Sequence, residues 1–595
     1  MSAPDDPLVA DDAVVEVRDD HDHEAAADDH EAAADDDGQL GWTPRPALLG
    51  AAAFLVYLVL AILQWGLPVM THYSTRYLTR FRADPDFYRW ALAWTPWALL
   101  HGHDPLYSHY VFAPGGIDLT WSALIPGPAI VMYPITSLFG SVASSNTLKL
   151  LSFSLAGWGA YLVCHRLTKA FWPSLLGGYL FGFSTYMVGQ GGHLNLILIF
   201  PIPLLVYLAI RHVEGSMGTP TFIALTALAL LGLFSISTEL FGTTVLFGGI
   251  AYVLALIFAG KDRIRVVKTA VFTGIAYVIV GAAIFVPYLL PAIRNTPDET
   301  LHPLARASAD LYGFVVPRPD ILIRFRPLAH ISNRFSANLY EDASYIGIAL
   351  VLMLIGFGIT ERRRRGTWAL LLFVLIVSIL SLGPVLHIEG RMLFQMPGAL
   401  VAKIPLLKNA TAQRWPMYSS LAIGVIAAIW VARGDERFGW IRWTVVIIGA
   451  LMLLPHNPPD AGYPYDRTPA FFTQGTYRTV LHPDDNVLLI VGSRGEEMLW
   501  QSEADFAFRM PEGYTGPLPP ALRNEQLFRG LAVEGTLVVI PTPEELQKWM
   551  TSQQVTAVVM VDTAAARYGL ILRQAGLQPV YRGGGVSVWR MPEGP

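Results

Sequence analysis

The chain has 595 residues, of which 53% are apolar and 15% charged, and its mean hydropathy is +0.41. This composition is too apolar and too sparsely charged for a water-soluble protein of this length, so it predicts a polytopic membrane protein. The formal net charge of −5 comes largely from the first residues, so it points to no nucleic-acid partner. A single cysteine, Cys164, excludes an intramolecular disulfide.

Residues 1–44 are acidic and contain a near-repeat in which His23 and His30 each begin the same seven-residue run. Such low-complexity sequence cannot bury a core, so we expect a disordered cytoplasmic tail. Its histidines could hold a metal loosely, but a solvated tail is the favoured interpretation. The first apolar segment starts late and is long enough to span, so we expect no cleavable signal peptide.

Apolar segments near membrane length recur through residues 45–456 and predict a transmembrane domain of eleven spans. They cover Ala47 to about Met70, then about 147–166, 172–190, 194–211, 219–237, 240–260, 269–291, 344–360, 367–385, 417–432 and 443–456. Short connections rich in Lys and Arg alternate with connections that have none. This alternation predicts a cytoplasmic N-terminus and a C-terminal segment outside. The parity requires that the Pro- and Gly-rich segment Ser122–Phe139 does not cross, so we expect an interfacial or re-entrant helix there.

The first outer loop, 71–146, contains Asp84-Pro-Asp86 followed by the tryptophan-rich run Trp90–Trp97. Indole rings prefer the headgroup layer, so the pattern predicts an interfacial helix with two carboxylates at its start. Helix capping is the plain alternative, with Pro85 at the first helical position and Asp86 favoured by the helix dipole. Capping and chemistry are compatible.

Ionisable residues near the membrane ends converge on the outer face, and this is the strongest functional signal in the sequence. They are Asp84, Asp86, His101, His103, Asp104, His193, Glu239, Glu341, Asp342 and Arg414. Glu239 lies between two apolar spans, where an acid is costly unless it faces a cavity or a partner. His193 lies at a similar turn. For both, a satisfied turn residue is the alternative.

A second outer loop, 292–343, contains six arginines and no lysine: Arg294, Arg306, Arg318, Arg324, Arg326 and Arg334. The guanidinium presents a fixed fork of donors that suits phosphate, so a phosphorylated lipid substrate is one interpretation. Binding of anionic headgroups, or pairing with acids of the same loop, is the other. A third outer loop covers 386–416, and Arg414 and Arg334 are the first candidates for holding phosphate.

Residues 457–595 lack membrane-length apolar runs and alternate short apolar runs with helical patterns, which predicts a small extracytoplasmic α/β domain. The expected strands are Val487–Val491, Thr536–Ile540, Ala557–Val561 and Val586–Met591, and the expected helices are Pro543–Gln554 and Ala564–Ala575. An aromatic, loop-like run, Phe508–Gly516, follows Trp500-Gln501. The sequence contains no phosphate-binding loop, dinucleotide fingerprint, zinc spacing or nucleophile elbow.

The order of elements resembles the GT-C superfamily of membrane glycosyltransferases. One span is followed by an outer loop with an acidic motif and an aromatic helix, and then by a Pro-rich juxtamembrane helix. Five runs resemble an uncharacterised bacterial branch of this superfamily: His101-Gly-His-Asp-Pro105, Ala113-Pro-Gly-Gly116, Gly192-His-Leu-Asn195, Glu341–Gly347 and Leu382-Gly-Pro384. The resemblance covers about 46–456 and extends more loosely to Trp500-Gln501 and Gly513-Tyr514.

The resemblance implies an α-helical polytopic GT-C-like fold and transfer of a sugar from a polyprenyl-phosphate donor to a cell-envelope acceptor. The transfer would occur outside a bacterial cytoplasmic membrane, with inversion. By position, Asp84 matches the general base and Asp86 is the runner-up. Basic residues would hold the departing phosphate. The expected substrate-binding residues are His103, His193, Glu239, Arg334, Glu341 and Arg414.

No cofactor is expected with certainty; a divalent cation is an open alternative, and no metal ligand is assigned. The sugar, the polyprenol and the acceptor, whether glycan, lipid or protein, stay open. Two other functions compete: a non-catalytic protein that binds lipid-linked glycans, and a transporter or flippase. A transporter would more often show internal repeats and charges at mid-bilayer.

Overall fold

The computed structural model describes residues 46–78, 83–297, 307–323, 326–336, 341–401, 403–404, 407, 409–456, 468–491, 495–522, 525 and 541–591. The predicted acidic tail, 1–44, lies outside the described residues. Pro46–Pro595 form one compact unit.

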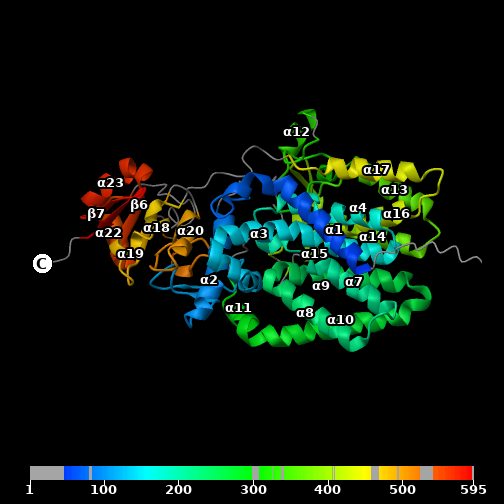
Figure 1. Cartoon of the computed structure of the whole chain (residues 1–595), viewed down its shortest axis with the longest axis horizontal. Helices are drawn as coiled ribbons and strands as arrows, with labels where there is room; N and C mark the ends of the chain where they lie inside the picture. The colour runs from blue at the N-terminus through cyan, green and yellow to red at the C-terminus, as the bar shows by residue number, and fades with distance from the viewer. Residues whose placement is uncertain are drawn as a thin grey trace, which may run out of the picture. The chain divides into compact units, whose positions relative to one another are not determined.

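Helices make up most of the described chain before residue 457 (Figure 1). In order they are α1 (Pro46–Ala61), α2 (Asp84–Leu100), α3 (Pro126–Thr168), α4 (Phe171–Gly182), α5 (Thr185–Gly189), α6 (Leu194–Ile197), α7 (Pro201–Val213), α8 (Thr219–Ile236), α9 (Thr238–Phe258), α10 (Arg263–Ile284), α11 (Leu290–Arg294), α12 (Arg326–Ser332), α13 (Ile348–Thr360), α14 (Arg365–Ser381), α15 (Gly398–Val401), α16 (Pro416–Ala432) and α17 (Gly439–Met452). Two short hairpins, β1 (Tyr107–Ser108) with β2 (Ile117–Asp118) and β3 (Val385–Ile388) with β4 (Arg391–Gln395), interrupt them.

Among the described residues, seven helical segments are long and apolar enough to cross a membrane, which confirms the polytopic helical fold. They are Pro46–His72, Pro126–Thr168, Leu194–Val213, Thr219–Ile236, Thr238–Phe258, Gly260–Arg294 and Ala412–Ala432. Three shorter apolar helices, α13, α14 and α17, match three more of the predicted spans. The remaining predicted span, 172–190, is divided between α4 and α5.

Helix α3 joins two segments that the sequence analysis separates. It runs for 43 residues with a kink at Gly140, where φ is 84° and ψ is 166°. The leg before the kink is the Pro- and Gly-rich segment, and its apolar side chains Val131 and Leu138 are 76% and 74% exposed. The leg after the kink contains the predicted span 147–166. That the first leg does not cross the bilayer stays a prediction.

Glycines let the central helices approach closely. A Cβ atom on Gly177 of α4 would lie 2.5 Å from the carbonyl oxygen of Gly424 of α16, and the reverse contact has the same distance. In a membrane protein, small residues at such crossings allow backbone-to-backbone packing. The segment Ala412–Ala432 contains α16, and 89% of its most apolar stretch is buried inside the protein. The corresponding share for the first segment, Pro46–His72, is 22%.

The C-terminal part contains a four-stranded sheet with strand order β5-β6-β8-β7. Its elements are α18 (Ala470–Thr473), α19 (Tyr477–Val480), β5 (Val487–Ile490), α20 (Glu496–Glu503), α22 (Pro543–Ser552), β6 (Ala557–Val561), α23 (Ala565–Gln574), β7 (Gln578–Gly583) and β8 (Val586–Arg590). Strands β5 and β6 are parallel, and the other two pairings are antiparallel. The predicted small α/β domain is confirmed, although β7 was not predicted and Thr536–Ile540 lies outside the described residues.

The tryptophan-rich run of α2 is not in the position that the sequence analysis predicts. Trp90 and Trp94 are 0% and 1% exposed, and both rings pack edge-on against Phe506 of the C-terminal part. The indole nitrogen of Trp90 donates a 2.8 Å hydrogen bond to Gln501. The predicted headgroup location is therefore wrong for these two rings, because the segment around α20 packs against α2 (Figure 1).

Candidate functional site

The N-terminus of α2 directs Asp84 towards two other elements. The preceding residue, Ala83, has φ of 68° and ψ of −76°, and an alanine offers no capping side chain. The Asp84 carboxylate makes two contacts across the fold: one oxygen lies 3.2 Å from Nε2 of His193, and the other accepts a 2.7 Å hydrogen bond from the hydroxyl of Tyr514. These partners come from the turn before α6 and from the C-terminal part.

Asp86 has a different environment from Asp84. It is 2% exposed and forms an ion pair with Arg89, one helical turn further along α2. The guanidinium of Arg89 is itself buried and lies 3.1 Å above the ring of Tyr77. A carboxylate in such a buried pair holds its partner in place, so Asp86 is less suited than Asp84 to meet a substrate.

A small depression lies beside Pro85. Two cationic side chains line it, Arg89 from α2 and Lys149 from α3, together with backbone of Gly191 and Gly192. The ammonium of Lys149 donates to the carbonyl oxygen of Leu78. The lining includes residues adjacent in sequence to Asp84 and to His193. The charge of Arg89 is balanced by Asp86, so the charge of Lys149 is the one that favours an anion there.

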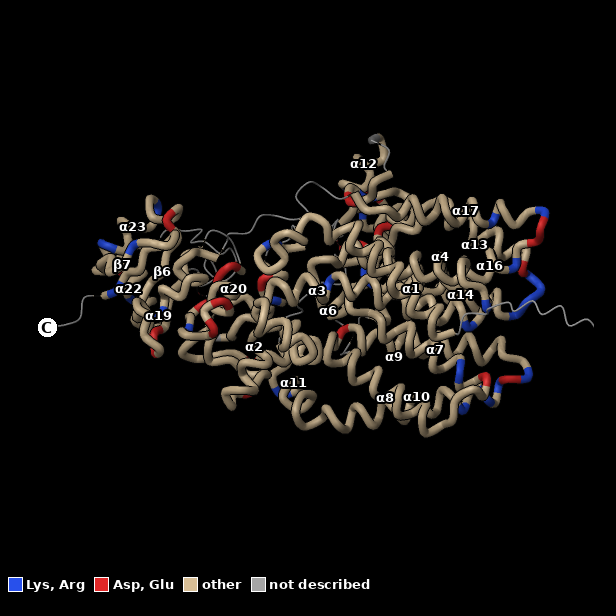
Figure 2. The backbone as a smooth tube through the Cα atoms, in the orientation of Figure 1, with Lys and Arg blue, Asp and Glu red and all other residues tan. Residues whose placement is uncertain are grey.

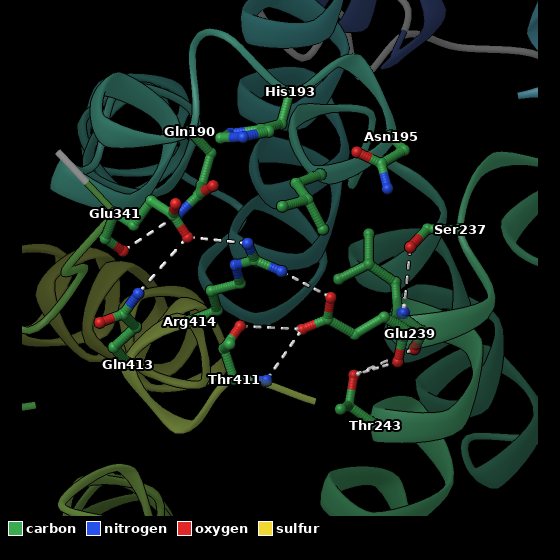
Figure 3. Close-up of polar contacts among 12 residues, drawn as sticks. Gln190, His193, Asn195, Ser237, Glu239, Thr243, Glu341, Thr411, Gln413 and Arg414 are labelled. Carbon is green, nitrogen blue, oxygen red and sulfur yellow. Dashed lines mark hydrogen bonds and ion pairs between the residues drawn. The ribbon is translucent and has the colours of Figure 1, made fainter. Parts of the chain in front are cut away.

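Arg414 bridges two carboxylates, and we call Glu239, Arg414 and Glu341 the Arg414 clamp (Figure 3). One guanidinium nitrogen lies 2.7 Å from Glu239 and another lies 2.8 Å from Glu341. Glu239 comes from the first turn of α9, and Arg414 ends a short 3₁₀ turn before α16. Two separate donors of one planar fork satisfy two acids, which a lysine could not do in the same geometry.

Neighbouring polar groups fix the Arg414 clamp. Glu239 also accepts hydrogen bonds from the backbone N–H and hydroxyl of Thr411, at 3.3 and 3.4 Å. The side chain of Gln413 donates to Glu341 at 3.4 Å, and Gln190 donates to the carbonyl oxygen of Glu341 at 2.9 Å (Figure 3). The start of α9 is capped by Ser237, which accepts from the N–H of Leu240.

Tyr88 connects the Asp84 pair with the Arg414 clamp. Its hydroxyl donates to the side-chain oxygen of Asn195, in the run that also contains His193. Burial, and then the charge of Asp84, raise the pKa of Tyr88 well above its usual value, whereas the charge of Arg414 lowers it. Tyr88 lies four residues after Asp84 on α2, so the two side chains share one face of the helix, and its partner Asn195 lies in the same region as the Arg414 clamp (Figure 3). We call this region the polar centre.

The structure brings together five of the predicted site residues and places others elsewhere. Asp84 and His193 are in contact, and Glu239, Glu341 and Arg414 form the clamp. His103 is exposed and stacks on Trp97, with ring centroids 5.4 Å apart. Arg334 is exposed and lies 2.9 Å from Glu389.

Among the loop arginines, Arg318 is fully buried and pairs with Asp320 at 2.7 Å, as the acid-pairing interpretation predicts for it. The neighbouring Asp342 is also buried, and burial raises its pKa although the charge of Arg318 lowers it. Arg306 and Arg324 lie outside the described residues.

Several members of the centre were not predicted as site residues, because their contacts are formed over long sequence separations. Tyr514 lies 430 residues from Asp84, and Gln190 lies 151 residues from Glu341. The only signal for Tyr514 was the short run Gly513-Tyr514. Lys149 gave no signal, since it is a single cation inside an apolar segment.

Among the described residues, no group of three His, Cys, Asp or Glu side chains could hold a metal ion. Asp84 and His193 supply two, while Glu239 and Glu341 are already paired with Arg414. No step proposed below uses a metal.

Comparison with known proteins adds a family and several similar solved structures. The family described as "Domain of unknown function (DUF6311)" matches residues 47–454, and no curated protein matches the sequence. The Archaeoglobus fulgidus oligosaccharyltransferase, tethered with an acceptor peptide, is similar at 11% identity and a TM-score of 0.48, covering 88% of this chain and 70% of that chain.

Two further solved structures are similar. ArnT from Cupriavidus metallidurans, bound to undecaprenyl phosphate, has 12% identity and a TM-score of 0.35, covering 91% of this chain and 97% of that chain. The mycobacterial arabinofuranosyltransferase AftD has 13% identity and a TM-score of 0.45, covering 93% and 42%. All three are GT-C glycosyltransferases, the superfamily that the sequence resembles. All three TM-scores are below 0.5, so the function proposed below rests on the geometry of the site.

Proposed function

The chain belongs to the DUF6311 family, and we propose that it is a membrane glycosyltransferase that moves a sugar from a polyprenyl-phosphate donor to an acceptor hydroxyl. The observation that carries the proposal is the environment of Asp84. Its carboxylate stands at the start of α2, 3.2 Å from His193 and 2.7 Å from Tyr514. A carboxylate held by oriented partners is suited to act as a general base.

In the proposed reaction, Asp84 takes the proton of the acceptor hydroxyl while the oxygen attacks the anomeric carbon. The bond between that carbon and the phosphate oxygen breaks, and the electron pair leaves with the phosphate on the polyprenol. Attack from the face opposite the phosphate inverts the anomeric centre. His193 orients the carboxylate, because its Nε2 atom lies 3.2 Å from one carboxylate oxygen.

The departing phosphate requires positive charge, and we assign it to Lys149. Lys149 lines the depression beside Pro85, next to the proposed base. Three arginines are already engaged by carboxylates: Arg414 by Glu239 and Glu341, Arg334 by Glu389, and Arg89 by Asp86. The assignment therefore moves from the outer-loop arginines to α3.

We place the sugar against the Arg414 clamp. The carboxylates of Glu239 and Glu341 are about four-fifths buried, and their hydrogen bonds to Arg414 hold them rigidly. Carboxylate oxygens have further lone pairs, so they can accept hydrogen bonds from sugar hydroxyls while paired. Hydrogen-bond acceptors held at fixed positions can distinguish one sugar from its isomers.

The site is proposed to face outside the cytoplasmic membrane of a bacterium. Glu239 lies in the first turn of α9, and Lys261 follows the other end of this 21-residue helix. A helix of this length spans about 30 Å, which is close to the thickness of a bilayer core. Lys261, Arg263 and Arg265 follow that end of α9, and Lys and Arg gather at one end of the helices in Figure 2, so that end is assigned to the cytoplasm and the site to the outside.

The proposal is tested by incubating the purified protein with a panel of radiolabelled polyprenyl-phosphate sugars and membrane acceptors. We expect transfer of label from one donor to acceptor material, and loss of that transfer in Asp84→Asn. Tight binding of a lipid-linked sugar without turnover, under conditions that support its transfer by membranes, would favour the non-catalytic binding protein instead.

A further inference from the structure

A segment near residue 514 is joined to the first loop by backbone hydrogen bonds. The N–H of Met510 donates to the carbonyl oxygen of Tyr110, and the N–H of Ala113 donates to the carbonyl oxygen of Met510, both at 3.0 Å. The N–H of Phe112 donates to the carbonyl oxygen of Glu512 at 3.3 Å. The segment that carries Tyr514 is therefore fixed to the loop that carries Asp84.

A second contact reaches the residue before Asp84. Ala83 has a positive φ, 68°, which costs energy in any residue with a Cβ atom, and it is 8% exposed. Gly495, with φ of 88°, packs directly against it: a Cβ atom on Gly495 would lie 2.6 Å from Cα of Ala83. Only a glycine leaves room for the Ala83 backbone in this conformation.

We propose that Tyr514 and Gly495 are positioning residues for Asp84, so that the catalytic centre is shared between the first loop and the C-terminal part. Gly495 admits the Ala83 backbone that aims Asp84, and Tyr514 fixes the carboxylate with its phenol. This inference rests on the proposed function and deepens it. A hydrogen bond donated to a carboxylate favours its ionised form, which is the form that a base needs.

Groups from three elements face Asp84. His193 approaches from the turn before α6, Tyr514 from the C-terminal part, and Tyr88 from α2 itself. Two members of the Arg414 clamp act on the pKa of Tyr88 in opposite directions. The charge of Arg414 lowers this pKa, and the charge of Glu239 raises it. Replacing Tyr514 alone leaves all the others in place.

The first test is the pH–rate profile of Tyr514→Phe, measured on the full-length protein. The variant loses one hydrogen bond to an ionised group, so we expect the acidic limb of the profile to move up by roughly one pH unit. Turnover below that limb falls about tenfold, while the KM for the lipid donor stays unchanged. Tyr477→Phe, at a buried tyrosine of the same part of the chain, is the matched control and leaves the limb in place. An unshifted limb in Tyr514→Phe overturns the inference.

The second test compares two glycines with positive φ. Gly495→Ala places a methyl group against Ala83, whereas Gly516→Ala, at φ of 97°, meets nothing within 4 Å. Both variants carry the backbone cost of a positive φ, so equal stability losses are expected from that source. We expect turnover to collapse in Gly495→Ala and to survive in Gly516→Ala. Equal turnover in the two variants contradicts a role for Gly495.

Asp84→Asn separates failure of this inference from failure of the proposed function. If Asp84→Asn abolishes transfer but Tyr514→Phe behaves as wild type, Asp84 is the base and the C-terminal part does not position it. If Asp84→Asn transfers sugar at the wild-type rate, the proposed base is wrong, and the inference falls with it.

Discussion

The Arg414 clamp offers the clearest prediction about stability. Arg414→Ala removes a guanidinium that lies 2.7 Å from Glu239 and 2.8 Å from Glu341. The three side chains are only 10 to 20% exposed, so water cannot replace the lost contacts. Breaking a buried ion pair by removing one partner typically costs about 3 to 5 kcal/mol. Here two acids are left facing each other, so we expect the upper part of that range.

Arg414→Lys refines the prediction because it keeps the charge and loses the fork. A single ammonium can reach one carboxylate well but cannot repeat both short contacts, so a loss of about 1.5 to 3 kcal/mol is expected. Removing all three charges, in Arg414→Gln combined with Glu239→Gln and Glu341→Gln, restores most of the stability lost in Arg414→Ala. The assay is the thermal unfolding midpoint of the detergent-solubilised protein.

The opposite result would refute this reasoning. If Arg414→Ala unfolds at the wild-type midpoint and only weakens donor binding, Arg414 is held by its substrate rather than by its two acids. A phosphate ligand would then be the better description of Arg414, and the assignment of phosphate to Lys149 would have to be withdrawn.

Two further predictions concern Glu497 and Lys149. Glu497 is 2% exposed, and its burial, with the charge of Asp86, raises its pKa to about 8. Between about pH 4.5 and 8, the folded protein keeps a proton on Glu497 that the unfolded chain has released. The free energy of unfolding therefore falls as the pH rises through this range, and Glu497 contributes at most about 1.4 kcal/mol per pH unit. Glu497→Gln should raise the unfolding midpoint at pH 8 and flatten its dependence on pH; an unchanged slope would contradict the burial argument. Lys149→Gln should raise the KM for the lipid donor roughly tenfold, because a charged hydrogen bond to phosphate is lost. Lys169→Gln, at an exposed position beyond the end of α3, is its control, and equal effects of the two variants would disprove the site.

The sequence predicted what depends on composition and local pattern. The apolar segments predicted the helices, because membrane length and hydropathy are properties of contiguous residues. Asp84-Pro-Asp86 predicted the start of α2 to within one residue, because proline at an early helical position and acids in the first turn are local signals. Asp84 was expected to cap the helix, whereas it is the first helical residue and Ala83 precedes it. The strands β5, β6 and β8 followed from short apolar runs.

The contacts between distant segments could not be predicted in the same way. Trp90 was predicted to meet lipid headgroups because nothing near it in the sequence indicates Gln501, which lies 411 residues away. Arg414 was predicted to hold phosphate for its fork geometry, and that geometry is used by Glu239 and Glu341 instead. The partner that each side chain meets depends on tertiary packing, which the neighbouring residues in the sequence do not indicate.

The most direct test of the proposed function is the single-turnover rate of Asp84→Asn with a saturating polyprenyl-phosphate sugar. Asparagine keeps an oxygen that can accept the hydrogen bond from Tyr514, so expression and donor binding should be retained. Loss of a general base typically lowers the rate by about two to four orders of magnitude, and we expect a loss in that range. A wild-type rate in Asp84→Asn, with or without loss of activity in Asp86→Asn, would show that Asp84 is not the base.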